Sequence, residues 1–180
     1  MRILAALVAA LALVACSKNE TPPRTTTSES VTAAKLALSS SAFAEGEGIP
    51  RTYTCDGADV SPPVSWKVPP DTAELALLVE DPDAPNGTFV HWVLYGISPD
   101  VASLAEGSSA VGTNGTNSFG KKGYGGPCPP KGTRHRYVFT VWALSEKTKL
   151  AEGATASQLR DAMPATQVVA QDRLTGVYGR

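Results

Sequence analysis

Residues 75–97, LALLVEDPDAPNGTFVHWVLYGI, contain two apolar runs on either side of a charged loop. The first run, residues 75–79, is apolar without alternation, which is typical of a strand covered on both faces, and residues 89–97 have the same character. Pro82 and Pro85 lack amide donors and disfavour helix in the residues before them, so the loop is neither helix nor central strand. The sequence therefore predicts two buried strands joined by a rigid, charged loop.

The rest of the folded part is predicted to be mostly β. Thr155 is a possible helix N-cap, Gln158 follows three residues later and Pro164 ends the pattern, which predicts one helix over residues 155–163. The other predicted strands cover residues 35–38, 51–55, 136–144 and 168–178. Residues 98–118 are predicted to be mostly loop, with a short extended piece around 110–112. Many strands, few helices and long proline-rich loops indicate a mainly antiparallel sandwich with one or two peripheral helices.

The N-terminus has the features of an export signal. Met1-Arg2 precedes an apolar run, residues 3–15, that is short for a membrane span and ends in Leu-Val-Ala-Cys. That tetrapeptide resembles the lipobox of bacterial lipoproteins, which implies a signal peptide over residues 1–15 that is removed and a lipid on Cys16. The alternative is an ordinary secretory signal in which Cys16 is incidental.

The segment after this cysteine is predicted to be a tether. Residues 16–34 are rich in Ser, Thr and Pro and have too few apolar side chains to form a core, so we expect a disordered tether before a domain at 35–180. In lipoproteins of bacteria with two membranes, a serine such as Ser17 favours sorting to the outer membrane. We therefore expect a lipid-anchored protein of the bacterial cell envelope, on the outer membrane and facing the periplasm.

Two cysteines remain in the predicted domain, Cys55 and Cys128. An even pair in an exported domain favours a disulfide. Two alternatives stay open: both are buried thiols, or Cys128 is a nucleophile.

Charge is balanced overall but uneven along the chain. The net charge is −1, and neither this charge nor the placing of the aromatic residues supports nucleic-acid binding, so we expect no nucleic-acid partner. Between Glu106 and Glu146 there is no acidic residue. This interval holds five cations, Lys121, Lys122, Lys131, Arg134 and Arg136. They form either a solvated face or an anion-attracting rim.

The only two histidines are predicted to lie at one edge of the sheet. Asp81 ends the first central strand, His91 lies near the start of the second, and His135 immediately precedes the third. Antiparallel pairing brings these positions together, and Tyr137, two residues after His135, shares its face. Such a group suits a phosphate-like anion. The alternative is that Asp81 caps its turn and the histidines are core residues.

Four segments carry a resemblance to a known family. EDPDAPNGTFVHW (80–92), GYGGPCPPKGTRHRYVF (123–139), YTCDGADVSPPVSW (53–66) and LTGVYGR (174–180) resemble the phosphatidylethanolamine-binding proteins, also called Raf kinase inhibitor proteins, in their bacterial branch. The resemblance implies a large, mainly antiparallel sheet packed on a smaller one, with a pocket for phosphate, phosphoethanolamine or similar anions and no cofactor. By motif, the pocket residues are Asp81, Pro85, His91, Pro127, His135 and Tyr137.

Three functions compete. We expect a membrane-tethered, non-enzymatic binding or regulatory domain for a small phosphorylated or anionic ligand, with no protein partner identified. The first alternative is an inhibitor of an envelope hydrolase that docks through residues 120–134. The second is a Cys-His hydrolase built from Cys128, His135 and Asp81, which is disfavoured by the prolines flanking the cysteine. No metal-site spacing accompanies the histidines, so we expect no metal.

Overall fold

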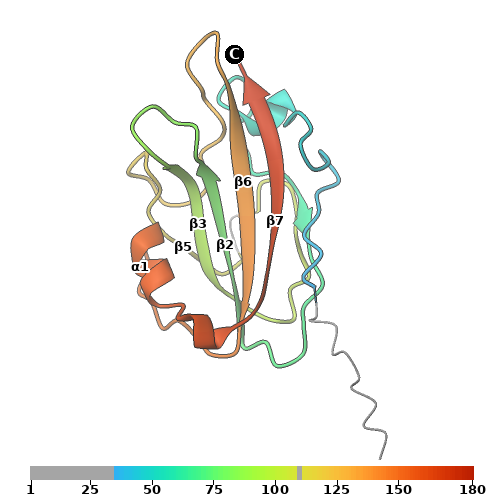
Figure 1. Cartoon of the computed structure of the whole chain (residues 1–180), viewed down its shortest axis with the longest axis vertical. Coiled ribbons are helices and arrows are strands. Elements are labelled where there is room, and N and C mark those ends of the chain that lie inside the picture. The colour runs from blue at the N-terminus through green and yellow to red at the C-terminus, as the bar shows by residue number, and fades with distance from the viewer. Residues whose placement is uncertain (1–34, 109–110) are drawn as a thin grey trace, which may run out of the picture. The chain divides into compact units, whose positions relative to one another are not determined.

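The computed structural model describes residues 35–108 and 111–180, which form two antiparallel sheets with short helices (Figure 1). The predicted signal peptide over 1–15, the lipidated Cys16 and the tether over 16–34 lie outside these residues. In the described ranges no helix has the length and apolar character needed to cross a membrane.

The large sheet has five strands in the order β5-β3-β2-β6-β7, all antiparallel to their neighbours. They are β2 (Glu74–Asp81), β3 (Phe89–Ile97), β5 (Thr113–Asn114), β6 (Arg134–Leu144) and β7 (Val168–Gly179). The predicted hairpin of the two central strands, the third strand antiparallel to the first, and a last strand at the C-terminus are all confirmed.

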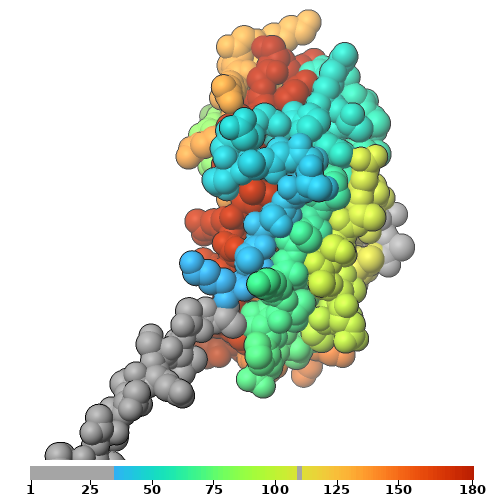
Figure 2. All heavy atoms as spheres, turned by 90° about the vertical axis from the view of Figure 1, so that its right-hand side faces the viewer, coloured from blue at the N-terminus to red at the C-terminus, as the bar shows by residue number. Residues whose placement is uncertain are grey.

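The second sheet consists of β1 (Val64–Ser65) and β4 (Ser103–Leu104). In Figure 2 the blue and green segments of the N-terminal half lie beside the yellow segment that follows β3, and together they cover one face of the large sheet. This arrangement confirms the predicted fold class, a large antiparallel sheet packed on a smaller one.

The unalternating apolar run of β2 is explained by burial on both faces. Leu75, Leu77 and Val79 pack in one cluster with residues of the second sheet, while Ala76 and Leu78 pack in another cluster below α1 (Ala156–Asp161). All five side chains are fully buried. Burying one leucine contributes about 1.5–3 kcal/mol, so this strand is a large part of the core energy.

Helix α1 begins as the sequence predicts. The Thr155 hydroxyl accepts from the Gln158 amide, and the Gln158 side chain accepts from the Thr155 amide, which completes a capping box. A second short helix, η2 (Ala165–Gln167), follows Pro164.

Two predicted N-terminal strands are wrong. Residues 51–55 form a 3₁₀ helix, η1 (Arg51–Tyr53), because the Tyr53 amide donates to the carbonyl of Pro50 and so closes a tight turn. Residues 35–38 form no strand because Ala37 has a φ of 49°, which interrupts an extended ladder. Of the extended piece predicted around 110–112, residue 110 lies outside the described residues, and the short strand in this part of the chain is β5, after Gly112.

Candidate functional site

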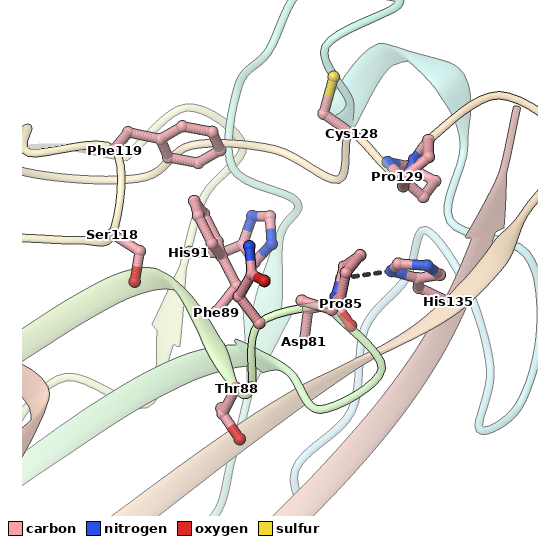
Figure 3. Close-up of a pocket in the computed structure, with 14 residues that line it drawn as sticks. Asp81, Pro85, Thr88, Phe89, His91, Ser118, Phe119, Cys128, Pro129 and His135 are labelled. Carbon is pink, nitrogen blue, oxygen red and sulfur yellow. Dashed lines mark hydrogen bonds and ion pairs between the residues drawn. The ribbon is translucent and has the colours of Figure 1, made fainter.

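A cavity of about 490 Å³ opens at the edge of the large sheet where β2 ends and β3 begins (Figure 3). Asp81, Pro85 and Phe89 come from one side, and Phe119, Cys128 and Pro129 face them from the other. The lining residues are Asp81, Ala84, Pro85, Asn86, Gly87, Thr88, Phe89, His91, Ser118, Phe119, Cys128, Pro129, Pro130 and His135.

The first polar group of the cavity is the pair formed by Asp81 and His135. The register of β2 on β6 places the end of one strand beside the start of the other. His135 Nδ1 lies 2.7 Å from Asp81 Oδ2, and the two residues are only 7% and 4% exposed. The other Asp81 oxygen accepts from the Asp83 amide at 2.8 Å. Asp81 therefore caps its turn and binds a histidine at the same time.

The second polar group is His91, whose ring is held by the loop at Gly125. His91 Nδ1 lies 2.7 Å from the Gly125 carbonyl oxygen. Its ring also contacts the rings of Phe89, Phe119 and Tyr137, with centroid distances of 5.1, 5.6 and 5.1 Å. Burial lowers the pKa of His91, and the Gly125 carbonyl and the Asp81 charge only partly oppose this.

The loop over residues 81–88 is fastened to β6 by Arg136. Its guanidinium donates to both oxygens of Asp83, at 2.9 and 2.6 Å, and its backbone amide donates to the same carboxylate. These bonds lower the pKa of Asp83 to about 2. The loop therefore stays close to the strand that carries His135.

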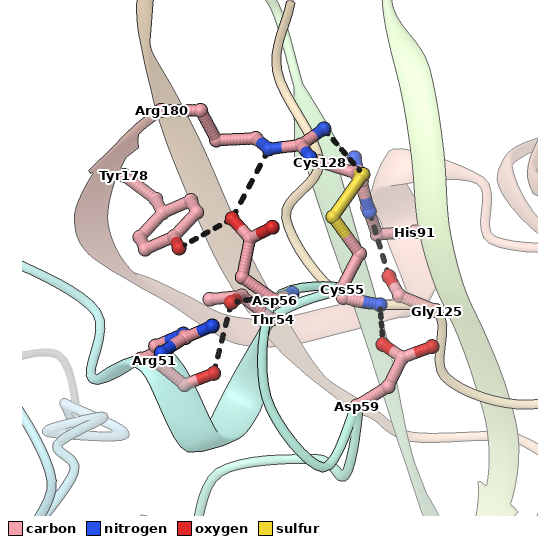
Figure 4. Close-up of a disulfide and its surroundings, with 11 residues drawn as sticks. Arg51, Thr54, Cys55, Asp56, Asp59, His91, Gly125, Cys128, Tyr178 and Arg180 are labelled. Atoms are coloured by element: carbon pink, nitrogen blue, oxygen red, sulfur yellow. Dashed lines mark hydrogen bonds and ion pairs between the residues drawn. A yellow bond between two sulfur atoms is a disulfide. The ribbon is translucent and has the colours of Figure 1, made fainter. Parts of the chain in front are cut away.

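The opposite wall, residues 124–130, is fastened to residues 53–59. Cys55 and Cys128 form a disulfide, which confirms the predicted pairing (Figure 4). The Cys55 amide donates to the Pro127 carbonyl at 3.1 Å, and the Gly126 amide donates to Asp59 at 2.6 Å. In the disulfide Cys128 has no free thiol, so the predicted nucleophile role would need a reduced protein.

The C-terminal residue adds a further contact at this wall. Arg180 forms an ion pair with Asp56 at 3.1 Å, and its guanidinium donates to Cys128 Sγ at 3.3 Å. Figure 4 shows this side chain extended across the disulfide.

The structure brings together four of the six predicted ligand-binding residues as lining of one cavity: Asp81, Pro85, His91 and His135. Pro127 is not among the lining residues of this cavity: its carbonyl accepts from the Cys55 amide, and the prolines of this wall that line the cavity are Pro129 and Pro130.

Tyr137 lies below the cavity and does not line it. Its ring is fully buried against His91, and its hydroxyl is one of two buried side-chain oxygens in residues 35–108 and 111–180 that lack a hydrogen-bond partner. Burial raises the pKa of Tyr137, and the nearby Asp81 charge adds to this.

The sequence did not predict the aromatic edge of the cavity, which Phe89 and Phe119 form. Phe119 is 43% exposed and packs edge-on against Phe89, with ring centroids 4.7 Å apart. Phe89 could have been found, because it lies two residues before His91 on a strand and so shares its face. Phe119 lies in a polar, glycine-rich stretch with no periodic signal.

The five cations predicted to form a solvated face or an anion-attracting rim fall into two groups, those in ion pairs and those outside them. Lys122 pairs with Glu152 at 2.9 Å, and Arg136 pairs with Asp83. Within the described residues no ion pair engages Lys121, Lys131 or Arg134, and all three are exposed. In the same ranges no group of three or more His, Cys, Asp or Glu side chains is placed to bind a metal ion.

Comparison with known proteins gives one family. A family model described as phosphatidylethanolamine-binding protein matches residues 39–179. A Mycobacterium tuberculosis protein named as a lipoprotein, LppC, is 43% identical over 168 residues, covering 88% of this chain and 83% of its own. A UPF0098 protein of Aquifex aeolicus is 44% identical over 149 residues, covering 78% of this chain and 86% of its own.

Two solved structures have a similar fold. The crystal structure of CT736, a homologue of phosphatidylethanolamine-binding proteins from Chlamydia trachomatis, matches with a TM-score of 0.76 at 41% identity, covering 79% of this chain and 96% of that one. YbcL of E. coli, described as a new member of the mammalian family, matches with a TM-score of 0.74 at 29% identity, over 82% and 99% of the two chains.

Proposed function

Because this chain belongs to the phosphatidylethanolamine-binding protein family, we propose that it is a non-enzymatic ligand-binding domain whose cavity takes a small anionic group, such as phosphate or phosphoethanolamine. One observation carries the proposal. The only two histidines of the chain line the same cavity, and one of them is bonded to a buried carboxylate.

The chemistry of the cavity supports an anion with an organic substituent. His135 uses Nδ1 for Asp81, and its Nε2 lies 3.3 Å from the Thr133 hydroxyl, which itself donates to the Pro130 carbonyl, so Nε2 is placed to donate. Exposed Lys131 and Arg134 lie in the segment between the second wall and this histidine and attract negative charge. Phe89, Phe119 and the prolines give the rest of the cavity an apolar surface for a substituent.

A titration followed by NMR tests this function. In the Cys16→Ser chain the imidazole signals of His91 and His135 are resolved, and phosphate or phosphoethanolamine is added up to millimolar concentration. We expect saturable shifts of both histidines. Asp81→Asn should abolish them, whereas Asp161→Asn, the same change at an exposed position of α1, should leave them intact. Unchanged histidine signals in the parent chain would exclude the proposal.

We also propose that the domain is anchored to the cell envelope through a lipid on Cys16, on the outer membrane and facing the periplasm. The lipobox sequence and a relative named as a lipoprotein support this. Cells fed labelled palmitate should label the native chain and not Cys16→Ser, and membrane fractionation should place the label with outer-membrane markers. Equal labelling of both chains would contradict the anchor.

The alternative of a hydrolase inhibitor acting through residues 120–134 is favoured by one feature, the exposed cations Lys121 and Lys122, which lie outside the lining of the cavity. The double variant Lys121→Gln, Lys122→Gln separates the two functions. Loss of inhibition of envelope hydrolases by this variant, with phosphate binding retained, would support the inhibitor. Native protein that inhibits none of them would exclude it.

A further inference from the structure

The tautomer of His91 is fixed by a reciprocal pair of bonds with Gly125. A carbonyl oxygen only accepts, so the 2.7 Å contact requires a proton on His91 Nδ1. The Gly125 amide in turn donates to the His91 carbonyl at 2.9 Å. Since a neutral imidazole has a single N–H, the other ring nitrogen, Nε2, is left with a lone pair and can only accept.

The surroundings of His91 favour this neutral form. The residue is 3% exposed, and the aromatic rings of Phe89, Phe119 and Tyr137 surround it. Burial lowers its pKa, while two negative charges face it from other segments, Asp81 at the end of β2 and Asp59 from the N-terminal loop.

The other polar groups of the cavity, Asp81 and His135, offer different hydrogen-bonding positions from His91. Both oxygens of Asp81 are already engaged, by His135 and by the Asp83 amide. The Thr133 hydroxyl donates to the Pro130 carbonyl at 2.8 Å, so toward His135 Nε2, 3.3 Å away, its oxygen accepts, and this nitrogen is a donor. The hydrogen bond that orients the His91 ring uses Nδ1 and not Nε2. The cavity therefore has an acceptor at one histidine and a donor at the other.

We propose that this cavity selects a phosphate monoester in its singly protonated form, with His91 Nε2 accepting from the P–OH group and His135 donating to a phosphoryl oxygen. The inference rests on the proposed function and names its ligand class. His91 is then the residue that determines specificity, and the tie to Gly125 positions it.

Anions without a hydroxyl bind less well in such a cavity. Sulfate, a phosphodiester and the doubly charged phosphate monoester carry only acceptor oxygens. Each would place a lone pair against that of His91 Nε2 and leave this buried acceptor without a donor. The cost of one such unsatisfied group corresponds to roughly a 10-fold loss of affinity.

Two esters of equal charge test the inference. At pH 5.5 methyl phosphate is mainly a monoanion with one P–OH group, because its second pKa is about 6. Dimethyl phosphate is also a monoanion but has no hydroxyl. In the Cys16→Ser chain we expect methyl phosphate to bind about 10-fold more tightly. Equal affinities would overturn the inference and leave the proposed function standing. If neither ester binds, both fail.

The matched variant is His91→Asn. Its side-chain amide can replace Nδ1 as the donor to Gly125, but nothing replaces Nε2, so the preference should fall to nearly equal affinities. A preference that persists in this variant would contradict the role of His91. Methylammonium, which also donates, is the competing ligand, and tighter binding of it than of methyl phosphate would likewise overturn the inference.

The tautomer can be measured directly in the native chain, independently of any variant. A long-range ¹H–¹⁵N correlation spectrum at neutral pH should show His91 neutral and protonated on Nδ1. A proton on Nε2, or on both nitrogens, would refute the arrangement even if phosphate binds.

Discussion

Removal of the Cys55–Cys128 disulfide should lower the free energy of unfolding by about 4 kcal/mol. The two cysteines are separated by 73 residues, and the entropy of closing a loop of this length in the unfolded chain gives that magnitude. Both cysteines are exposed, so Cys55→Ser together with Cys128→Ser leaves no buried cavity to add a packing loss.

The folded state should change little in the double-serine variant. The Cys55 amide still donates to Pro127, and the Gly126 amide still donates to Asp59, so the second wall keeps its ties to residues 53–59. The loss of stability should therefore come from the unfolded chain, which becomes more expanded and exposes more surface.

Urea denaturation in the Cys16→Ser background, followed by tryptophan fluorescence, measures this. We expect a lower midpoint together with a larger m-value, because m increases with the surface exposed on unfolding. The single variant Cys55→Ser and the thiol-reduced parent should match the double variant, and the oxidised parent should show no titratable thiol. A loss below about 1 kcal/mol, or a large loss with an unchanged m-value, would refute the argument from loop entropy.

Three further changes test the site and its supports. Tyr95→Phe breaks bonds to Ala151 and Ala154 and should lower the free energy of unfolding by about 1–3 kcal/mol, whereas Tyr137→Phe, whose hydroxyl forms no bond of normal geometry within the described residues, should lower it by less; urea denaturation compares them, and an equal loss would contradict this. Because the pKa of Asp83 is lowered in the folded state, its carboxylate contributes stability above pH 3.8, and this contribution is lost as the pH falls toward 2. Arg136→Gln should therefore lower the urea midpoint at pH 7 and have little effect at pH 2, and an equal effect at both would contradict this. Gly115→Ala places a Cβ 2.2 Å from the Ala154 carbonyl oxygen and should cost about 1–3 kcal/mol in thermal or urea unfolding, while Gly48→Ala, which meets nothing within 4 Å, should be neutral.

The central strands could be predicted because their local pattern and their burial agree. An apolar run without alternation requires cover on both faces, and β2 has a core cluster on each side. The cap of α1 could also be predicted from the sequence, because Thr155 and Gln158 are only three residues apart. Such features depend on residues that are close in sequence or that lie in the same sheet.

The N-terminal errors have two other origins. Residues 51–55 have strand-forming side chains, but the Pro50 carbonyl closes a local 3₁₀ turn there, and residues 35–38 are held by long-range bonds such as that from the Leu38 amide to Asp172. A local turn decides the first conformation and a tertiary contact the second, and β-propensity alone contains neither.

The two histidines of the site differ in the same way. The Asp81–His135 pair follows from strand register, which runs without interruption from Glu74 opposite Leu144 to Glu80 opposite Val138. The sequence could therefore place it at the sheet edge. The orientation of the His91 ring follows instead from Gly125, whose position depends on bonds between residues 124–128 and 53–59 that are distant in sequence.

The two parts of the proposed site therefore depend on two different kinds of structure. The Asp81–His135 pair is placed by the register of two central strands. The acceptor that would distinguish one anion from another is on His91 of β3, whose ring is oriented by a loop that a disulfide and several side-chain bonds hold in place. Relatives that keep the two histidines but tie this loop differently could bind anions and still differ in which protonation state they accept.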